Sequence, residues 1–117
     1  MVTERRDYLA LEWVAGEITE TLTQSAAALD EFLQNRDDVT RLRFCLTYIH
    51  QVYGTLKMVE FAGAALLAGE MEEVVQGLLS HKIGEAQRDD ALLALKAALT
   101  KLPGYLQQLL AQRRDAP

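Results

Sequence analysis

The spacing of apolar residues between positions 42 and 59 constrains the fold more than any other feature of the sequence. These residues recur at alternating intervals of three and four, at Leu42, Cys45, Ile49, Val52, Leu56 and Val59. Side chains three and four positions apart lie on the same face of an α-helix. The stretch therefore predicts an amphipathic helix with one apolar stripe, which Asp37 or Asp38 can cap at its start.

Three further stretches have the same periodicity and predict three more helices. The first runs over 7–33, with inward positions at Leu11, Ala15, Ile18, Leu22, Ala26, Leu29 and Leu33. The third runs over 61–80, with inward positions at Ala64, Leu67, Met71, Val74 and Leu78 and with small residues at Gly63, Ala65, Ala68 and Gly69 that allow close packing. The fourth begins near position 90, with inward positions at Leu92, Leu95, Leu99, Leu102, Leu106 and Leu109.

The segments at 34–38 and 80–90 are rich in residues that cap or break helices. The connection before the third helix is short. Short connections make consecutive helices antiparallel neighbours. The sequence therefore predicts an all-α, antiparallel four-helix bundle that forms a single domain over 1–117. Pro103 is expected to kink or split the fourth helix. A kink is favoured, because the apolar phase continues through it.

Composition narrows the class of function. The chain has 117 residues and a formal charge of -5, which argues against nucleic-acid binding because phosphate contacts need clustered Lys and Arg. No apolar run approaches the roughly 20 residues that cross a bilayer, and the first residues lack the apolar region of a signal peptide. A cytoplasmic protein without membrane insertion is expected. Cys45 is expected to be a buried core thiol rather than a reactive one.

The polar face of the second helix carries His50, together with Arg43, Gly54 and Lys57 in the same helical sector. A glycine inside a helix costs about 1 kcal/mol relative to alanine, which asks for a reason. One reason is access, because a partner could approach the imidazole closely while the two cations attract a phosphoryl group. The alternative is that His50 is an ordinary surface residue and that Gly54 relieves crowding against a neighbouring helix.

The segment His50-Gln51-Val52-Tyr53-Gly54-Thr55 resembles the His-x-x-Lys-Gly-Ser signature of histidine phosphotransfer domains, the four-helix modules of phosphorelays and chemotaxis kinases. The resemblance covers roughly residues 40 to 75. It implies that His50 accepts a phosphoryl group and exchanges it with receiver domains, and that Gly54 lets a receiver dock. Such a module supplies the nucleophile but has no autonomous catalysis. Tyr53 stands where the family usually has lysine, and Lys57 is a partial substitute for that charge.

A closer likeness is to the N-terminal segment of ChpA-type hybrid chemotaxis histidine kinases, FimL-related proteins that control type IV pili and twitching motility. It rests on the stretches 7–14 and 43–52. It implies that the chain is an N-terminal fragment of a much larger two-component kinase. The expected docking residues are Arg43, Gln51, Tyr53, Gly54 and Lys57. The expected partners are receiver domains, the kinase core of the same system and a polar scaffold protein.

A second hypothesis is a degenerate, non-phosphorylated module that keeps the fold for docking or dimerisation. Tyr53 favours it, and so does Glu60, which stands where many phosphotransfer domains have glycine and adds a negative charge near the site. Trp13 and Tyr8 are interpreted as core aromatics, with an exposed docking patch as the alternative. His81 is interpreted as a helix-terminal residue. No cofactor or metal is expected, because no Glu-x-x-His pair repeats on facing helices.

Overall fold

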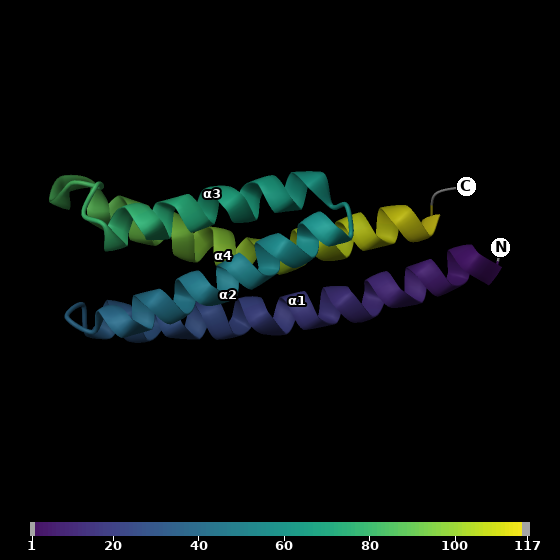
Figure 1. Ribbon diagram of the computed structural model, residues 1–117, viewed down its shortest axis with the longest axis horizontal. Coiled ribbons are helices and arrows are strands. Elements are labelled where there is room, and N and C mark those ends of the chain that lie inside the picture. The colour runs from purple at the N-terminus through teal and green to yellow at the C-terminus, as the bar shows by residue number, and fades with distance from the viewer. Residues whose placement is uncertain (1, 116–117) are drawn as a thin grey trace.

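The computed structural model describes residues 2–115, with side chains described for residues 9–112 other than Leu11. Four helices fill almost all of this length: α1 (Val2–Gln34), α2 (Val39–Met58), α3 (Ala62–Leu79) and α4 (Glu85–Asp115). They form an antiparallel bundle 53 Å long and 19 Å across, shown in Figure 1. The predicted all-α four-helix bundle is confirmed.

The helices are arranged as a square in which each contacts two neighbours. α1 lies beside α2 and α4, and α3 completes the square by lying beside the same two helices. α1 and α4 are the long members, and both continue past the connection between α2 and α3, so the described parts of the two chain ends lie at the same end of the bundle (Figure 1). The fourth helix is continuous through Pro103, so no split occurs there.

One hydrophobic cluster joins all four helices. The predicted α2 stripe is buried from Leu42 to Leu56, and Val59 packs against its end. The predicted inward positions of α3 agree less well with the structure. Val75 is buried, while the predicted Leu67 and Val74 are only half-buried. Along α4 the stripe is confirmed to Leu106, but Leu110 rather than Leu109 is buried near its end. In α1 the buried set also includes Ser25, Ala28 and Phe32, and Leu11 lies outside the described side chains.

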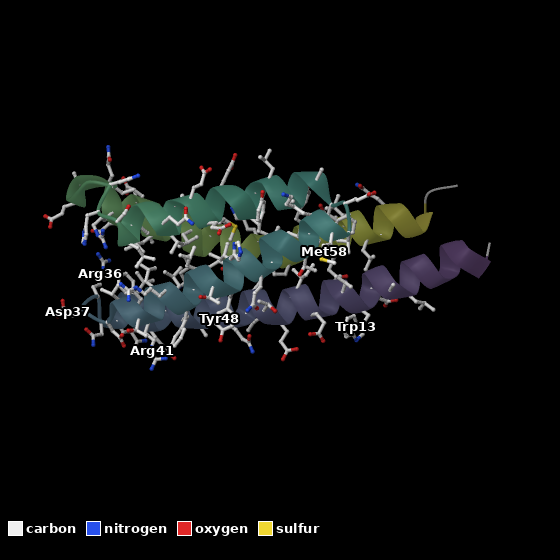
Figure 2. The ribbon with its side chains drawn as sticks, viewed as in Figure 1. Trp13, Arg36, Asp37, Arg41, Tyr48 and Met58 are labelled. Carbon is white, nitrogen blue, oxygen red and sulfur yellow. The ribbon has the colours of Figure 1, made fainter. Side chains whose placement is uncertain are left out.

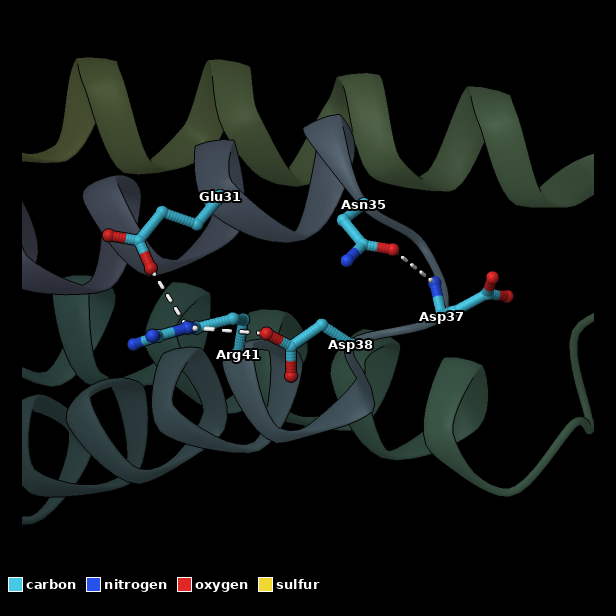
Figure 3. Close-up of polar contacts among 5 residues, drawn as sticks. All are labelled: Glu31, Asn35, Asp37, Asp38 and Arg41. Carbon is cyan, nitrogen blue, oxygen red and sulfur yellow. Dashed lines mark hydrogen bonds and ion pairs between the residues drawn. The ribbon is translucent and has the colours of Figure 1, made fainter.

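The turn between α1 and α2 is organised by a salt-bridged arginine rather than by an aspartate cap. Asp38 occupies the N-cap position, but its carboxylate makes no capping hydrogen bond. It lies instead 3.4 Å from Nε of Arg41, which also contacts Glu31 of α1 at 3.0 Å (Figure 3). The expectation of a side-chain cap from Asp37 or Asp38 is therefore wrong, because Arg41 competes for the carboxylate.

The connection between α2 and α3 begins with a Schellman motif. The N–H of Phe61 donates to the carbonyl of Leu56 at 3.0 Å, and that of Glu60 donates to the carbonyl of Lys57 at 3.2 Å. This geometry places Glu60 at φ 63°, in the left-handed region where glycine is favoured. His81 has the same role after α3, with φ 60° and a bond from the N–H of Lys82 to the carbonyl of Gly77. The helix-terminal interpretation of His81 is confirmed.

Cys45 is fully buried and participates in the main polar contact inside the core. The hydroxyl of Ser25 donates to the carbonyl of Cys45 at 3.0 Å and lies 3.2 Å from its sulfur. Burial raises the pKa of the Cys45 thiol to about 11, and the contact with Ser25 offsets part of that rise. A thiol in this setting is a poor nucleophile, as expected from the sequence.

This raised pKa predicts a specific loss of stability at alkaline pH. Between pH 9.0 and about 11 the unfolded chain loses the Cys45 proton while the folded chain keeps it, so the free energy of unfolding falls as pH rises. We expect a loss of about 2 kcal/mol across this range relative to Cys45→Ala, measured by urea unfolding. Wild-type and variant curves that stay parallel across the range would contradict the assignment.

Candidate functional site

The burial of the α2 stripe determines where the polar residues of α2 lie. Side chains one position after the buried residues, at His50, Tyr53 and Lys57, turn toward α3. The side chain of His50 is 69 % exposed, which confirms the predicted orientation toward solvent. Its position nevertheless brings it against the neighbouring helix.

The imidazole of His50 is held by a carboxylate from α3. Its Nδ1 lies 2.6 Å from Oε1 of Glu72, whose side chain is only 15 % exposed. A glutamate carboxylate accepts hydrogen bonds and does not donate them, so Nδ1 carries a hydrogen, and in the neutral ring the lone pair is on Nε2. Glu72 is not predictable as this partner from the sequence, because helical periodicity does not reveal which residue of one helix lies opposite a given residue of the next.

Tyr53 fills the space that a glycine of α3 leaves open. Its Cε2 lies 3.1 Å from the position that a Cβ on Gly69 would occupy. The ammonium of Lys57 lies 5.3 Å from the centre of the Tyr53 ring, in a cation–π arrangement. Tyr53 therefore packs at the edge of α3, and Lys57 directs its charge over the phenol ring.

These residues border a groove between α2 and α3 with a volume of about 660 Å³. Its lining is made by His50, Tyr53, Lys57, Ala62, Ala65, Leu66, Gly69, Glu70, Glu72, Glu73 and Gln76. The charges of the two helices are segregated. α2 carries Arg and Lys but no acid, and α3 carries three glutamates but no base. In the groove, Lys57 makes one wall basic, and Glu70, Glu72 and Glu73 make the other wall acidic, whereas the sequence predicts a purely cationic face.

Three of the predicted docking residues lie outside the lining of this groove: Arg43, Gln51 and Gly54. Gly54 is exposed, and no atom of another element lies within 4 Å of the position that its Cβ would occupy. The interpretation that Gly54 relieves crowding is therefore wrong. The open space agrees with the alternative, in which the glycine leaves the surface beside His50 accessible.

Two other residues lie away from the His50 groove. Glu60 lines a separate, smaller groove with Tyr105 and Gly63, so its charge is not part of the acidic wall. Trp13 is 69 % exposed, so its interpretation as a core residue is wrong, and the side chain of Tyr8 lies outside the described residues.

Within the described side chains, no three His, Cys, Asp or Glu residues lie close enough together to bind a metal ion. The described helices include none with the length and apolarity that crossing a bilayer requires.

Comparison with known proteins places the chain in a family. The model of the FimL C-terminal domain matches residues 8–117. The chain belongs to this family. It is 32 % identical over 108 residues to the scaffold protein FimL of Pseudomonas aeruginosa strain PAO1. The aligned region covers 92 % of this chain but only 19 % of that relative. No solved structure gives a significant match.

Membership of the FimL C-terminal domain family confirms the FimL-related part of the expected resemblance. All residues of the groove fall within the matched region, including the His50–Glu72 pair. The relationship to histidine phosphotransfer domains and to ChpA-type kinases stays a prediction.

The two glycines beside the groove predict opposite responses to an added methyl group. Gly54→Ala should raise the free energy of unfolding by about 1 kcal/mol, because alanine favours the helix and the site is open. Gly69→Ala should gain less or lose stability, because the new Cβ meets the Tyr53 ring. Chemical denaturation of the two variants tests this pair, and a larger gain at Gly69 would contradict the packing described.

Proposed function

We propose that this chain is a docking module of a scaffold that regulates type IV pili, and that the groove between α2 and α3 is its docking surface. The observation that carries the proposal is the form of this groove in a chain whose named relative is a scaffold. The groove is open because its lining includes the small residues Ala62, Ala65 and Gly69. The side chain of Leu66 lies at its edge and is 66 % exposed. An apolar centre with a charged rim is the usual composition of a protein–protein interface.

The segregated charges give this surface an orientation. A partner that places acidic side chains over Lys57 and basic ones over Glu70 and Glu73 is favoured, and the reversed orientation brings like charges together. Tyr53 adds an aromatic ring to the basic wall, and aromatic residues commonly contribute strongly to binding energy. Tyr53 stands where histidine phosphotransfer domains usually have a lysine. A phenol without that positive charge suits protein contact better than phosphoryl transfer.

The docking surface can be tested with two leucines that are equally exposed. Leu66 borders the groove and Leu93 lies on α4, and both are 66 % exposed. We expect immobilised Leu66→Ser to bind about tenfold less partner protein than immobilised wild type, because the change removes a large exposed apolar side chain from the groove. Leu93→Ser should retain them at the wild-type level, as read by quantitative mass spectrometry.

His50→Ala separates docking from phosphoryl chemistry in the same assay. Capture that survives this change supports docking by shape and charge. Equal losses for Leu66→Ser and Leu93→Ser would show that the groove is not the interface, and the proposal would then be wrong.

A second function, phosphoryl acceptance on His50, is favoured by one observation, the bond to Glu72. With the hydrogen held on Nδ1, the lone pair of Nε2 can attack the phosphorus of a donor. The N–P bond forms as the P–O bond to the donor's leaving group breaks, and the electron pair of that bond leaves with its oxygen. The phosphorylated ring keeps the Nδ1 hydrogen, and its positive charge faces the Glu72 carboxylate.

Glu72→Gln tests this second function. The amide can still accept the Nδ1 hydrogen but has no charge to stabilise the phosphorylated ring, so the rate of labelling should fall roughly tenfold. The measurement is intact mass at neutral pH after incubation with ATP and the catalytic core of a chemotaxis-type kinase. His50→Ala is the control and should take no label. Labelling of His50→Ala at the wild-type rate, or no labelling of wild type by an active kinase, would exclude His50 as the acceptor.

A further inference from the structure

A second exposed apolar surface lies on the other flank of α2, away from the groove. Leu9, Trp13 and Met58 are 55 %, 69 % and 84 % exposed. Leu9 and Trp13 are four residues apart and share one face of α1. Met58 is the last residue of α2. Within the described residues, no element covers these three large apolar side chains at the point where α2 ends and α1 continues.

The register of α1 and α2 brings these side chains to the same level. Ser25 bonds to Cys45, and Glu31 pairs with Arg41. Extending this antiparallel register places Met58 level with residues 12 to 14. Figure 2 shows Trp13 and Met58 at neighbouring positions along the bundle axis. We call Leu9, Trp13, Gly16 and Met58 the Trp13 patch.

Gly16 leaves the backbone of α1 open within this patch. It is exposed, and no atom lies within 4 Å of the position that its Cβ would occupy. It stands three residues after Trp13, so the gap lies beside the indole. A glycine in a helix interior disfavours the helix, and no neighbouring side chain that the structure describes requires a glycine here. A partner helix could approach α1 closely at this position.

The described charged side chains of α1 beside Trp13 are all acidic. Glu17 and Glu20 follow Trp13 at four and seven residues, so they continue its face, and Glu12 adjoins it. Between Leu9 and Gln34 the sequence has five acidic residues and no Lys or Arg, whereas Arg5 and Arg6 lie outside the described side chains. An acidic rim repels anionic lipid headgroups, and it would meet its own copy in a twofold dimer.

We propose that the Trp13 patch docks an amphipathic helix of a partner protein, with apolar side chains that cover Trp13 and Met58 and with Lys or Arg residues that face Glu17 and Glu20. Leu9, Trp13 and Met58 are not among the residues that line the groove, so the patch is a separate surface. This inference stands on its own observations and does not need the groove to be a docking site.

The sole tryptophan of the chain makes the test direct. The probes are two synthetic helical peptides with the same leucine face, one with lysine and one with glutamate at the polar positions, and neither contains an aromatic residue. We expect the lysine peptide to shift Trp13 emission to shorter wavelength in a saturable titration. The glutamate peptide should bind about tenfold more weakly or not at all. Added salt should weaken the binding of the lysine peptide, because it screens the charges.

Matched variants locate the binding on the 117-residue chain. The double change Leu9→Ser with Met58→Ser should lower the affinity for the lysine peptide about tenfold. Leu66→Ser in the groove and Leu93→Ser on α4 should leave this affinity unchanged. Glu17→Lys with Glu20→Lys should reverse the preference between the peptides. Leu9 and Met58 belong to the Trp13 patch, Glu17 and Glu20 to its acidic rim, Leu66 to the groove and Leu93 to neither surface. Circular dichroism checks that each variant stays folded.

Several results would overturn the inference. An emission shift that is absent, or that is lost equally with Leu93→Ser, would show that the peptide binds elsewhere. A shift that appears with protein concentration alone, together with a dimeric mass, would mean that a second copy covers the patch. A shift with vesicles of phosphatidylcholine and phosphatidylglycerol but not with the lysine peptide would identify a lipid surface instead.

Discussion

The rest of the structure depends on the burial of one stripe of α2. Leu42, Cys45, Ile49, Val52 and Leu56 are all inaccessible to solvent, and burying a large aliphatic side chain contributes about 1.5 to 3 kcal/mol. Rotating α2 by one residue, about 100°, would expose this stripe. Its burial therefore fixes the rotation of the helix and, with it, the residues on each flank. His50, Tyr53 and Lys57 are turned toward α3, and Arg41 is turned toward α1.

Rotation alone does not fix how far one helix is shifted along another, and polar contacts help to fix this. The hydroxyl of Ser25 has its partner at Cys45 inside the core, where an unpaired hydroxyl would be costly. The pair of Glu31 with Arg41 lies at the surface and contributes less. On the other side of α2, the His50–Glu72 contact and the packing of Tyr53 on Gly69 specify a single register with α3. Docking surfaces built from side chains of two helices require such a register.

The same groove geometry is compatible with a docking surface and with a phosphoacceptor. A carboxylate that orients an exposed imidazole is useful for nucleophilic chemistry. It also removes the conformational freedom of a surface side chain before a partner arrives, which favours binding. The difference lies in the charges nearby, because Tyr53 supplies a ring rather than an ammonium and Lys57 rests on that ring. The proposal of a docking module rests on this difference and on the likeness to a relative that is named as a scaffold protein.

Much of this architecture follows from local periodicity, which is why the four helices, the α2 stripe, the burial of Cys45 and the exposure of His50 are predictable from the sequence alone. The periodicity of α3 is less decisive, because small residues occupy several faces and either Val74 or Val75 can turn inward. Glu72 as the partner of His50, the exposure of Trp13 and the position of Glu60 away from the groove were decided by tertiary structure. Each depends on where one helix ends or lies relative to another. That relative placement comes from side-chain packing between distant segments, which the spacing within one segment does not encode.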